Sequence, residues 1–363
     1  MGFITSLADS SLFIFQSSGC IIYLLLYVDD IIVTGNNSFQ IANLITTLNQ
    51  LFELKDLGTL NYFLGIQISH TKHGITLTQS NYAFDVLHRF NMENSKPVKT
   101  PCCSSSCLVP HSGVPLFDQF VYRSTVGALQ YLTFTKPDLA FSVHQLCQFM
   151  SKPTSDHLEV AKRVLRYLRG TLLHGICFSP SPLTLTAFSD ADWAGDPTDR
   201  HSTTSLLVFL GPYLISWFAK KQQTVSRSST EVEYRALATS AAELSWLRIL
   251  FREHKIFLPY VPVFWCDNDS ALALSTNLVF HSKTKHLEVD YHYIHEKVLC
   301  KDLHVGFVSG KDNLANIFTK PLSDHPFLFF CSKLLVDSSP NRLRGDVEEP
   351  DPQATNKLKL PLV

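Results

Sequence analysis

Charged residues are scarce in this 363-residue chain, at 17% of the total against about 25% in an ordinary globular domain. Neither sign prevails, since 31 Lys and Arg stand against 32 Asp and Glu. The chain therefore lacks the overall positive charge of a general nucleic-acid binder, and any such contact has to come from local patches. Its hydrophobic share of 45% excludes a disordered chain and suffices for a buried core. Its length predicts two to three domains.

Closely spaced pairs of cysteines are also missing. The nine cysteines include no CxxC pair, so a zinc ribbon or a thioredoxin-like site has no support. One cluster, Cys102, Cys103 and Cys107 with His111, has the wrong spacing for metal ligands and lies in a segment rich in Ser and Pro, which favours a linker. The other cysteines indicate buried thiols of a reducing compartment.

A membrane-spanning or secretory segment is absent as well. The longest uncharged run near the start covers residues 10–28, but its purely apolar part is Cys20 to Val28, whereas a spanning helix needs about twenty residues. No basic region precedes it, as a signal peptide would require. Met1 and Gly2 with Ser6 match the myristoylation pattern, which is short enough to arise by chance. We therefore expect no membrane partner.

Strands and a helix are expected close to the start of the chain. Residues 21–33 read IIYLLLYVDDIIV, which predicts two strands joined by a tight acidic turn at Asp29 and Asp30. Apolar residues then recur at helical spacing over residues 38–51, with Ser38 as the expected N-cap.

Residues 96–180 are expected to form a linker followed by a helical connection. The segment from Pro97 to Pro115 is rich in Pro, Ser and Cys, which is typical of a linker or a long loop. Helical periodicity then recurs three times, over residues 121–134, 137–150 and 155–169.

A mixed α/β pattern begins at Leu183. The expected order of elements is β-β-β-α-β-α-α-β-α, which predicts a single α/β domain over residues 183–325. Its first helix is long and is expected over residues 230–253. From Asp337 onward the residues are rich in Pro, Asn, Asp and Glu, and we expect the tail, residues 337–363, to be disordered.

Three acidic residues of this domain are expected to converge. Asp190 ends the first strand, Asp267 ends the fourth strand, and Glu233 lies in the first turns of the long helix. Carboxylates so placed repel one another unless a cation neutralises them, and they are hard ligands that suit Mg²⁺ or Mn²⁺. Two such ions about 3.5–4 Å apart would activate water and stabilise the leaving oxygen in phosphodiester hydrolysis. The alternative is three solvated acids at caps and loop starts.

Two basic patches supply positive charge locally. The first lies on the expected helix 155–169, where cations recur mostly at spacings of three or four. The second is a basic and aromatic stretch that leads into the helix carrying Glu233. Each patch either contacts phosphates or is a solvated face. The candidates are Lys162, Arg163, Arg166 and Arg169 in the first patch, and Lys220, Lys221 and Arg227 in the second.

Several ordered blocks of sequence resemble one family. The blocks FSDADWAG, SSTEVEYRALATSAAELSWL, WCDNDSALAL, KTKHLEVDYHYIHEKV and LANIFTKPL resemble the ribonuclease H domain of Ty1/copia-type retrotransposon Pol polyproteins. LLLYVDDIIVTG resembles the polymerase active-site turn of the same family's reverse transcriptase. LGIQI, YRSTVGALQYLTFTKPDLAFSV and HLEVAKRVLRYLRGT resemble the segments between the two. The resemblance runs over residues 1–335.

The resemblance implies a definite architecture and substrate. Residues 1–95 would be a truncated reverse-transcriptase palm and thumb fragment. Residues 183–325 would be a ribonuclease H-like five-stranded mixed sheet with helices on both faces. The implied partners are an RNA–DNA hybrid and the rest of a Pol polyprotein, in a cytoplasmic virus-like particle or in the nucleus. Hybrid specificity would come from 2′-hydroxyl contacts in the shallow minor groove.

The resemblance also implies the catalytic and metal-binding residues. Asp190, Glu233 and Asp267 match the family's carboxylates and would hold Mg²⁺ or Mn²⁺, two ions in all, to cut the RNA strand. Glu233 rather than Glu231 matches the acidic position before Tyr234. Residues two apart on a helix point to different faces, so Glu231 is expected to be an acid of the first turn that favours the helix dipole.

Two departures from the family's pattern bear on activity. The final block carries Asn316 where the family has Asp, and an amide brings no charge to a metal, so the second ion should bind more weakly; Asp312 nearby is a candidate substitute. The polymerase half keeps Asp29 and Asp30 but lacks the first catalytic Asp of an earlier strand. We therefore expect no DNA synthesis and interpret Met1 as the start of a truncated polyprotein.

Two functional hypotheses follow from these departures. One is an active ribonuclease H. The other is a catalytically inactive remnant that only binds nucleic acid. An unrelated metal-free binding domain does not account for the ordered family blocks.

Overall fold

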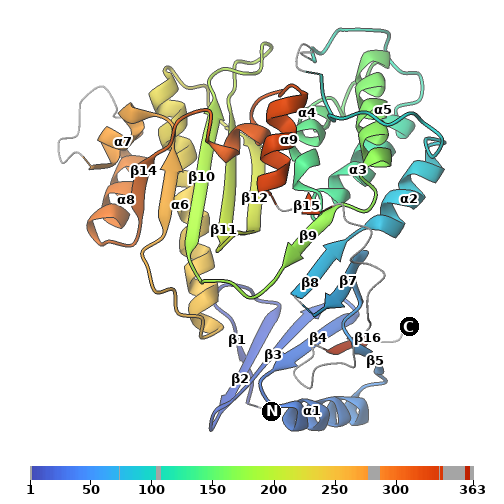
Figure 1. Cartoon of the computed structure of the whole chain (residues 1–363), viewed down its shortest axis with the longest axis vertical. Coiled ribbons are helices and arrows are strands. Elements are labelled where there is room, and N and C mark those ends of the chain that lie inside the picture. The colour runs from blue at the N-terminus through green and yellow to red at the C-terminus, as the bar shows by residue number, and fades with distance from the viewer. Residues whose placement is uncertain are drawn as a thin grey trace. The chain divides into compact units, whose positions relative to one another are not determined.

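The structure, a computed structural model, describes residues 2–72, 74–103, 108–276, 287–334, 336–337 and 356–359. The chain divides into two compact units (Figure 1). The first unit comprises Met1–Thr76, Ser245–Phe257 and Asn341–Val363, and the second comprises Leu77–Leu244 and Leu258–Pro340. No helix of the described part has the length and apolar character needed to cross a membrane.

An antiparallel sheet forms the centre of the first unit. Its first four strands are neighbours in chain order: β1 (Ile4–Thr5), β2 (Leu12–Ser17), β3 (Cys20–Tyr27) and β4 (Asp30–Gly35). The predicted pair of strands with an acidic turn is confirmed as β3 and β4. Val28 in this turn has a φ of 52°, the left-handed backbone that a tight turn requires.

Helix α1 (Ser38–Leu51) packs on this sheet through one apolar face, because Ile41 and Ile45 share a buried cluster with Val33 of β4. The helix has the predicted bounds, but its N-cap is Asn37 and not Ser38. The side chain of Asn37 accepts a hydrogen bond from the backbone N–H of Gln40 at 3.1 Å. Asn37 has the extended backbone that a capping residue needs, whereas Ser38 is already helical.

The rest of the first sheet includes a strand from the C-terminal tail. Strand β16 (Asn356–Lys359) lies between β4 and β5 (Lys55–Thr59) and pairs antiparallel with both. We expected disorder from Asp337 onward, but the described parts of the tail, β16 and β15 (Val336–Asp337), are strands. Peptide groups at a sheet edge can pair with an extended segment that reaches them. Strand β16 pairs in this way with the edges of both β4 and β5. The other tail residues lie outside the described part.

Strands β6 (Tyr62–Phe63), β7 (Ile66–Thr71) and β8 (Gly74–Thr78) follow β5. Helices of the second unit follow, and those after residue 119 lie where the periodicity predicts them. They are α2 (Ser80–Arg89), α3 (Phe120–Leu132), the 3-10 turn η1 (Pro137–Leu139), α4 (Ala140–Cys147) and α5 (Ser155–Gly170). Within the described residues 90–103 and 108–119 no helix or strand is formed, as expected for a linker. None of the cysteines that the structure describes forms a disulfide. Cys107 lies outside the described residues.

A five-stranded mixed sheet dominates the second unit, as predicted. Its strands are β10 (Leu185–Asp192), β11 (Thr203–Leu210), β12 (Tyr213–Lys221), β13 (Val263–Cys266) and β14 (His304–Phe307), in the spatial order β12-β11-β10-β13-β14. Strand β11 pairs antiparallel with both β10 and β12, whereas β13 pairs parallel with both β10 and β14. The short strand β9 (Gly175–Phe178) belongs to another sheet, in which it lies between β15 and β8.

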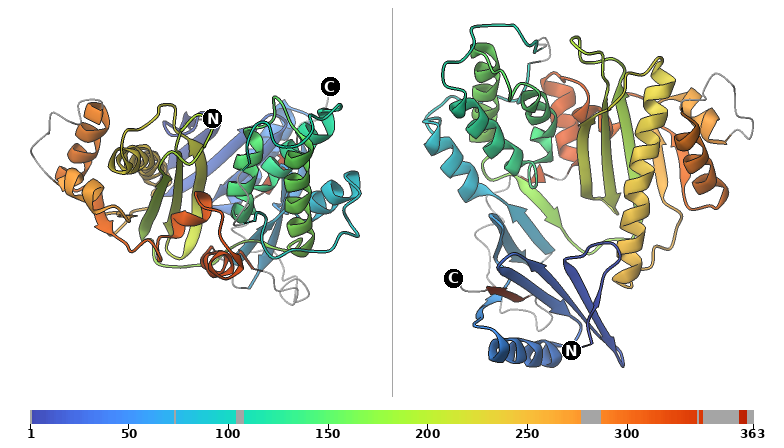
Figure 2. Two further views of the ribbon diagram at one scale, coloured as in Figure 1. Left: turned by 90° about the horizontal axis from the view of Figure 1, so that it is seen from above. Right: turned by 180° about the vertical axis from the view of Figure 1, so that it is seen from behind.

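Helices accompany this sheet in the predicted order. Helix α6 (Ser229–Glu253) runs along one face (Figure 2), and its Val232 and Ala236 pack against Ala191 of β10. The remaining elements are α7 (Asp269–Thr276), α8 (Glu288–Leu299), the 3-10 helix η3 (Leu314–Phe318) and α9 (Asp324–Lys333).

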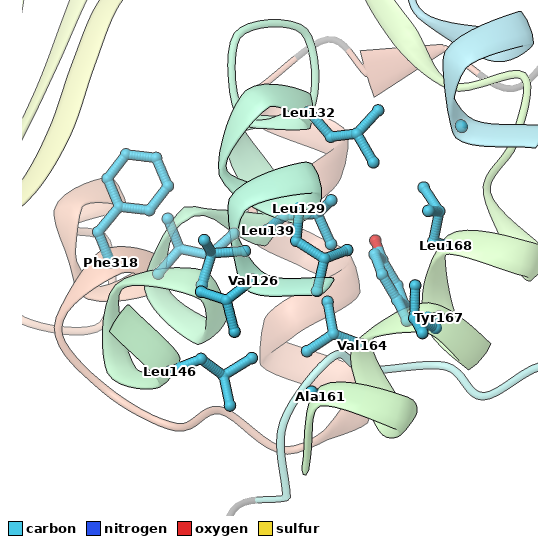
Figure 3. Packing of buried hydrophobic residues seen from close by; sticks show 14 of the residues in the cluster. Val126, Leu129, Leu132, Leu139, Leu146, Ala161, Val164, Tyr167, Leu168 and Phe318 are labelled. Carbon is cyan, nitrogen blue, oxygen red and sulfur yellow. The ribbon is translucent and has the colours of Figure 1, made fainter. Parts of the chain in front are cut away.

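A large hydrophobic cluster of the second unit joins the helical connection to the sheet. Figure 3 shows side chains of α3, α4 and α5 packed together with Phe318 of η3. Leu207 and Phe209 of β11 belong to the same core. The helical connection and the α/β part, which we expected as separate segments on either side of residue 180, are thus joined by shared packing. The fully buried members include Val126, Leu129, Leu132, Leu139, Leu146, Val164 and Leu168.

Candidate active site

Three carboxylates meet at one end of the five-stranded sheet. Asp190 comes from β10, Asp267 directly follows β13, and Glu233 lies near the start of α6. One oxygen of each lies within 4.8 Å of the others. Because β10 and β13 are adjacent and parallel, their carboxyl ends lie at the same edge. The structure therefore brings together the three acids expected from sequence. Strand β10 does not end at Asp190 as predicted, because its pairing with β11 continues to Asp192.

Burial and mutual repulsion act strongly on this cluster. Asp190 is 2% exposed and Glu233 is 8% exposed. Burial, and then the charges of Asp190 and Asp267, raise the pKa of Glu233 to about 9. Burial, followed by the charge of Asp190, also raises the pKa of Asp267. A divalent cation is the usual means by which proteins stabilise such a group of acids.

The hydrogen bonds of Glu233 leave one of its oxygens for a ligand. Oε1 accepts a hydrogen bond from the backbone N–H of Ala191 at 3.3 Å. Oε2 is buried and has no hydrogen-bond partner among the described residues. A buried carboxylate oxygen without a partner is costly, and its place beside two more carboxylates fits a divalent metal ion.

Glu231 points away from the cluster, as its spacing predicts. Its Oε2 accepts a hydrogen bond from the backbone N–H of Arg227 at 2.8 Å, and its Oε1 pairs with the Arg235 guanidinium at 2.7 Å. Glu231 therefore holds the first turns of α6 together.

Asn316 and the residues after it border the cluster. The Asn316 amide is buried, donates to the carbonyl oxygen of Gly310 at 2.5 Å, and accepts a hydrogen bond from the Lys320 ammonium. Lys320 Nζ also lies 3.3 Å from Asp190 Oδ1, and the Thr319 hydroxyl donates to Asp190 Oδ2. Sequence reasoning missed Thr319 and Lys320, although both stand in the LANIFTKPL block that pointed to Asn316.

Two further polar residues near the cluster were also missed. Asn313 Nδ2 donates to the backbone oxygen of Ser189 at 2.8 Å, which ties the loop before η3 to β10. Burial raises the pKa of Asp192 to about 7, against the effect of its hydrogen bond from Thr203. The suggested substitute Asp312 is exposed and does not belong to the carboxylate cluster found among the described residues.

Cations of the first basic patch make contacts within the protein. Arg163 donates to the Thr100 hydroxyl at 3.0 Å, and Lys162 pairs with Glu159 at 2.9 Å. Nε of Arg166 and Nε of Arg169 donate to backbone oxygens of the segment before the linker, those of Lys96 at 2.8 Å and Glu93 at 2.6 Å. The patch thus holds this segment against α5.

The second basic patch is divided between two roles. Lys221 lies 2.5 Å from a carboxylate oxygen of Asp196 and 2.7 Å from one of Asp199. Burial lowers the pKa of Lys221, but its hydrogen bonds to these two carboxylates outweigh burial and raise the pKa overall. Lys220, near the end of β12, and Arg227, just before α6, are both exposed to solvent.

The acidic turn of the first unit has a different environment. Asp30 begins β4 and is paired in register with Tyr27, and Asp29 lies in the turn between them. Within the described residues, Asp190, Glu233 and Asp267 form the one group of three or more His, Cys, Asp or Glu close enough to share an ion. Asp29 and Asp30 are outside that group.

Comparisons with known proteins identify the chain. Residues 1–104 match the family described as reverse transcriptase (RNA-dependent DNA polymerase). The retrovirus-related Pol polyprotein from transposon RE2 of Arabidopsis thaliana is 47% identical over 346 residues, 95% of this chain and 24% of that protein. The corresponding polyprotein from transposon TNT 1-94 of Nicotiana tabacum is 37% identical over 84% of this chain and 24% of its own length.

A shorter relative is matched over most of its length. A Saccharomyces cerevisiae protein ascribed to transposon Ty5-1 is 31% identical over 67% of this chain and 80% of that protein. A ribonuclease H domain from Mycobacterium tuberculosis, solved as a fusion with maltose binding protein, matches at 12% identity with a TM-score of 0.28 over 41% of this chain, a likeness too weak to define the fold.

The fold and these matches place the chain in a family of nucleic-acid enzymes from retroelements. It belongs to the Ty1/copia-type retrotransposon Pol polyproteins. The chain spans about a quarter of the length of the Arabidopsis and tobacco polyproteins that it matches.

Proposed function

We propose that residues 183–325 act as a ribonuclease H-type hydrolase that cuts the RNA strand of RNA–DNA hybrids. One observation carries the proposal: Asp190, Glu233 and Asp267, from three separate elements, present oxygens within 4.8 Å of one another in a buried cluster. The strand order of the sheet supports it, because it matches the mixed five-stranded architecture that the family resemblance implies.

Asp190, Glu233 and Asp267 would hold Mg²⁺ or Mn²⁺. A bound divalent ion would activate water and stabilise the leaving oxygen in phosphodiester hydrolysis. The protein's own contribution is to fix the ligands, since the Thr319 hydroxyl orients Asp190 and the backbone of Ala191 orients Glu233. Such hydrogen bonds hold ligand oxygens in position and limit their rotation.

Substrate contacts would come from exposed groups close to the acidic cluster. Lys220 and Arg227 flank the segment that leads into α6, the helix of Glu233. Cations there would neutralise backbone phosphates without reading sequence. Selection of a hybrid would depend on 2′-hydroxyl contacts across the shallow minor groove. The rest of a Pol polyprotein is the proposed partner, in virus-like particles or in the nucleus.

The alternative is an inactive remnant that only binds nucleic acid. Asn316 favours it, because a neutral, buried amide occupies the place of a family carboxylate. We further propose that the chain does not synthesise DNA. Asp29 and Asp30 lack a third carboxylate within reach among the described residues, and two-metal nucleotide transfer draws acids from more than one strand. Extension of a primed template by the purified chain would contradict this.

Cleavage of a labelled RNA–DNA hybrid, with Mg²⁺ and with Mn²⁺, tests the hydrolase directly. We expect the full chain to cut the RNA strand and to spare single-stranded RNA and duplex DNA. Asp190→Asn should abolish cutting while circular dichroism shows the same fold. A folded wild-type protein that binds the hybrid without cutting it would instead support the remnant hypothesis.

A further inference from the structure

A lysine ammonium lies against the carboxylate cluster. Lys320 Nζ is held by two acceptors: the Asn316 amide oxygen and Asp190 Oδ1, the latter at 3.3 Å. The Asp190 side chain is 2% exposed, whereas the Lys320 side chain is 46% exposed. The ammonium therefore reaches the cluster from the solvent side and meets the buried acid there.

The charge of this ammonium acts on more than one acid. It favours the ionised forms of Asp192, Glu233 and Asp267 in addition to its contact with Asp190. An ammonium at this position supplies part of the positive charge that a group of converging carboxylates requires.

Asn316 is suited to hold an ammonium and poorly suited to hold a metal ion. Its Nδ2 is committed to the Gly310 backbone oxygen, so its Oδ1 is turned toward Lys320. A neutral amide oxygen accepts from an ammonium without adding negative charge to attract a second divalent cation. A carboxylate at the same place would add that charge.

We propose that the Lys320 ammonium takes the place of a second divalent cation, so that Asp190, Glu233 and Asp267 bind one metal ion. This inference rests on the proposed function, because it concerns the metal content of the same site. Lys320 neutralises Asp190 next to Asn316, and Asp190, Glu233 and Asp267 would together hold the single metal ion.

Titration of the full, metal-free chain with MnCl₂ in a calorimeter tests the inference without any cleavage. We expect the wild type to bind one Mn²⁺ per chain. Lys320→Met should bind one Mn²⁺ at least about tenfold more tightly, because a neighbouring positive charge is lost. Lys320→Arg, which keeps the charge, should bind Mn²⁺ as the wild type does.

The Asn316→Asp variant separates the two parts of the proposal. With Lys320 present, the new carboxylate pairs with the ammonium, and the chain should still bind one Mn²⁺. The double variant Asn316→Asp with Lys320→Met should bind two, because the site then has a fourth carboxylate and no resident cation. Asp190→Asn should weaken Mn²⁺ binding in every background.

The outcomes distinguish this inference from the proposed function. Two Mn²⁺ ions bound by the wild type, unchanged affinity in Lys320→Met, or a single ion in the double variant would overturn the role of Lys320, even if the hybrid is cut. Loss of Mn²⁺ binding in the wild type and in Lys320→Met alike would overturn both the inference and the metal centre. If the Mn²⁺ stoichiometries are as expected but the chain does not cut the hybrid, only the proposed hydrolase activity is overturned.

Discussion

Glu231 and Glu233, two residues apart on α6, have different surroundings. Glu233 has a buried oxygen without a hydrogen-bond partner among the described residues, whereas both oxygens of Glu231 are bound by Arg227 and Arg235. Position on the helix decides which acid can serve a metal ion. Composition and charge do not separate the two.

Substituting these two glutamates in turn should separate metal binding from stability. Glu233→Gln should weaken Mn²⁺ binding at least about tenfold and abolish hybrid cleavage. Glu231→Gln should leave Mn²⁺ affinity unchanged and lower the free energy of unfolding by about 1–3 kcal/mol, because a buried ion pair with Arg235 is broken. Calorimetric titration and urea unfolding of both variants provide the check. An equal loss of Mn²⁺ affinity in both would show that the assignment to Glu233 is wrong.

His144 on α4 gives the molecule a sensitivity to acid. It lines a hollow of about 440 Å³ between α3, α4 and β12, and its Nε2 has no hydrogen-bond partner among the described residues. Burial, and then the charge of Lys221, lower its pKa from 6.5 to about 4. In the window from pH 6.5 down to pH 4 the unfolded chain binds this proton and the folded chain does not, so stability falls as pH falls.

Replacing His144 should remove that part of the pH dependence. The wild type should lose about 3 kcal/mol of unfolding free energy through this residue between pH 6.5 and pH 4. His144→Leu should show a shallower loss over the same window in urea unfolding. His304→Leu, at an exposed position, is the matched control and should behave as the wild type. Parallel curves for the wild type and His144→Leu would contradict the prediction.

Helix α5 and the segment before α6 show that basic patches of similar composition differ in use. The arginines of α5 donate to backbone oxygens of Glu93 and Lys96, whereas Lys220 and Arg227 face solvent. We expect the double substitution of Lys220 and Arg227 by Ala to weaken hybrid binding and to reduce the slope of log K against log salt concentration by about 1–2.

The matched control is the double substitution of Arg166 and Arg169 by Ala. It should leave the salt slope nearly unchanged and speed proteolysis between α2 and α3, because the segment before the linker loses two side chains that hold it. Binding measured over a series of salt concentrations, with limited proteolysis, tests both variants. A larger change of slope in the α5 variant would assign phosphate binding to α5.

Elements with strong local periodicity could be predicted, and elements defined by a partner strand could not. Helix α1 and the strands of the five-stranded sheet follow from apolar spacing, as did the convergence of Asp190 and Asp267 at one edge. Strands β9 and β16 depend on distant strands with which they pair. The same limit applied at the site: Lys320 carries no pattern of its own, and its role depends on a contact with Asp190, 130 positions away in the chain.

The helical connection and the sheet of the second unit should unfold together because α3, α4, α5 and β11 contribute to one buried cluster. Leu168→Ala on α5 removes a fully buried side chain and should cost about 2–5 kcal/mol. Protection of β11 amides against hydrogen exchange should fall by the same free energy, since Leu207 lies in that core. Lys162→Ala, half-exposed on the same helix, is the control. Unchanged protection of β11 in Leu168→Ala would mean that the helical connection unfolds separately.

Strand β16 has a practical consequence for anyone who shortens this chain. It lies between β4 and β5 and pairs with both. A version ending before Asn356 would leave two rows of peptide N–H and C=O groups facing each other across an empty slot. Such rows recruit strands from other molecules. Strand β16 therefore protects these two strand edges from aggregation. A shortened chain needs a replacement strand, or charged residues along β4 and β5, to stay soluble at high concentration.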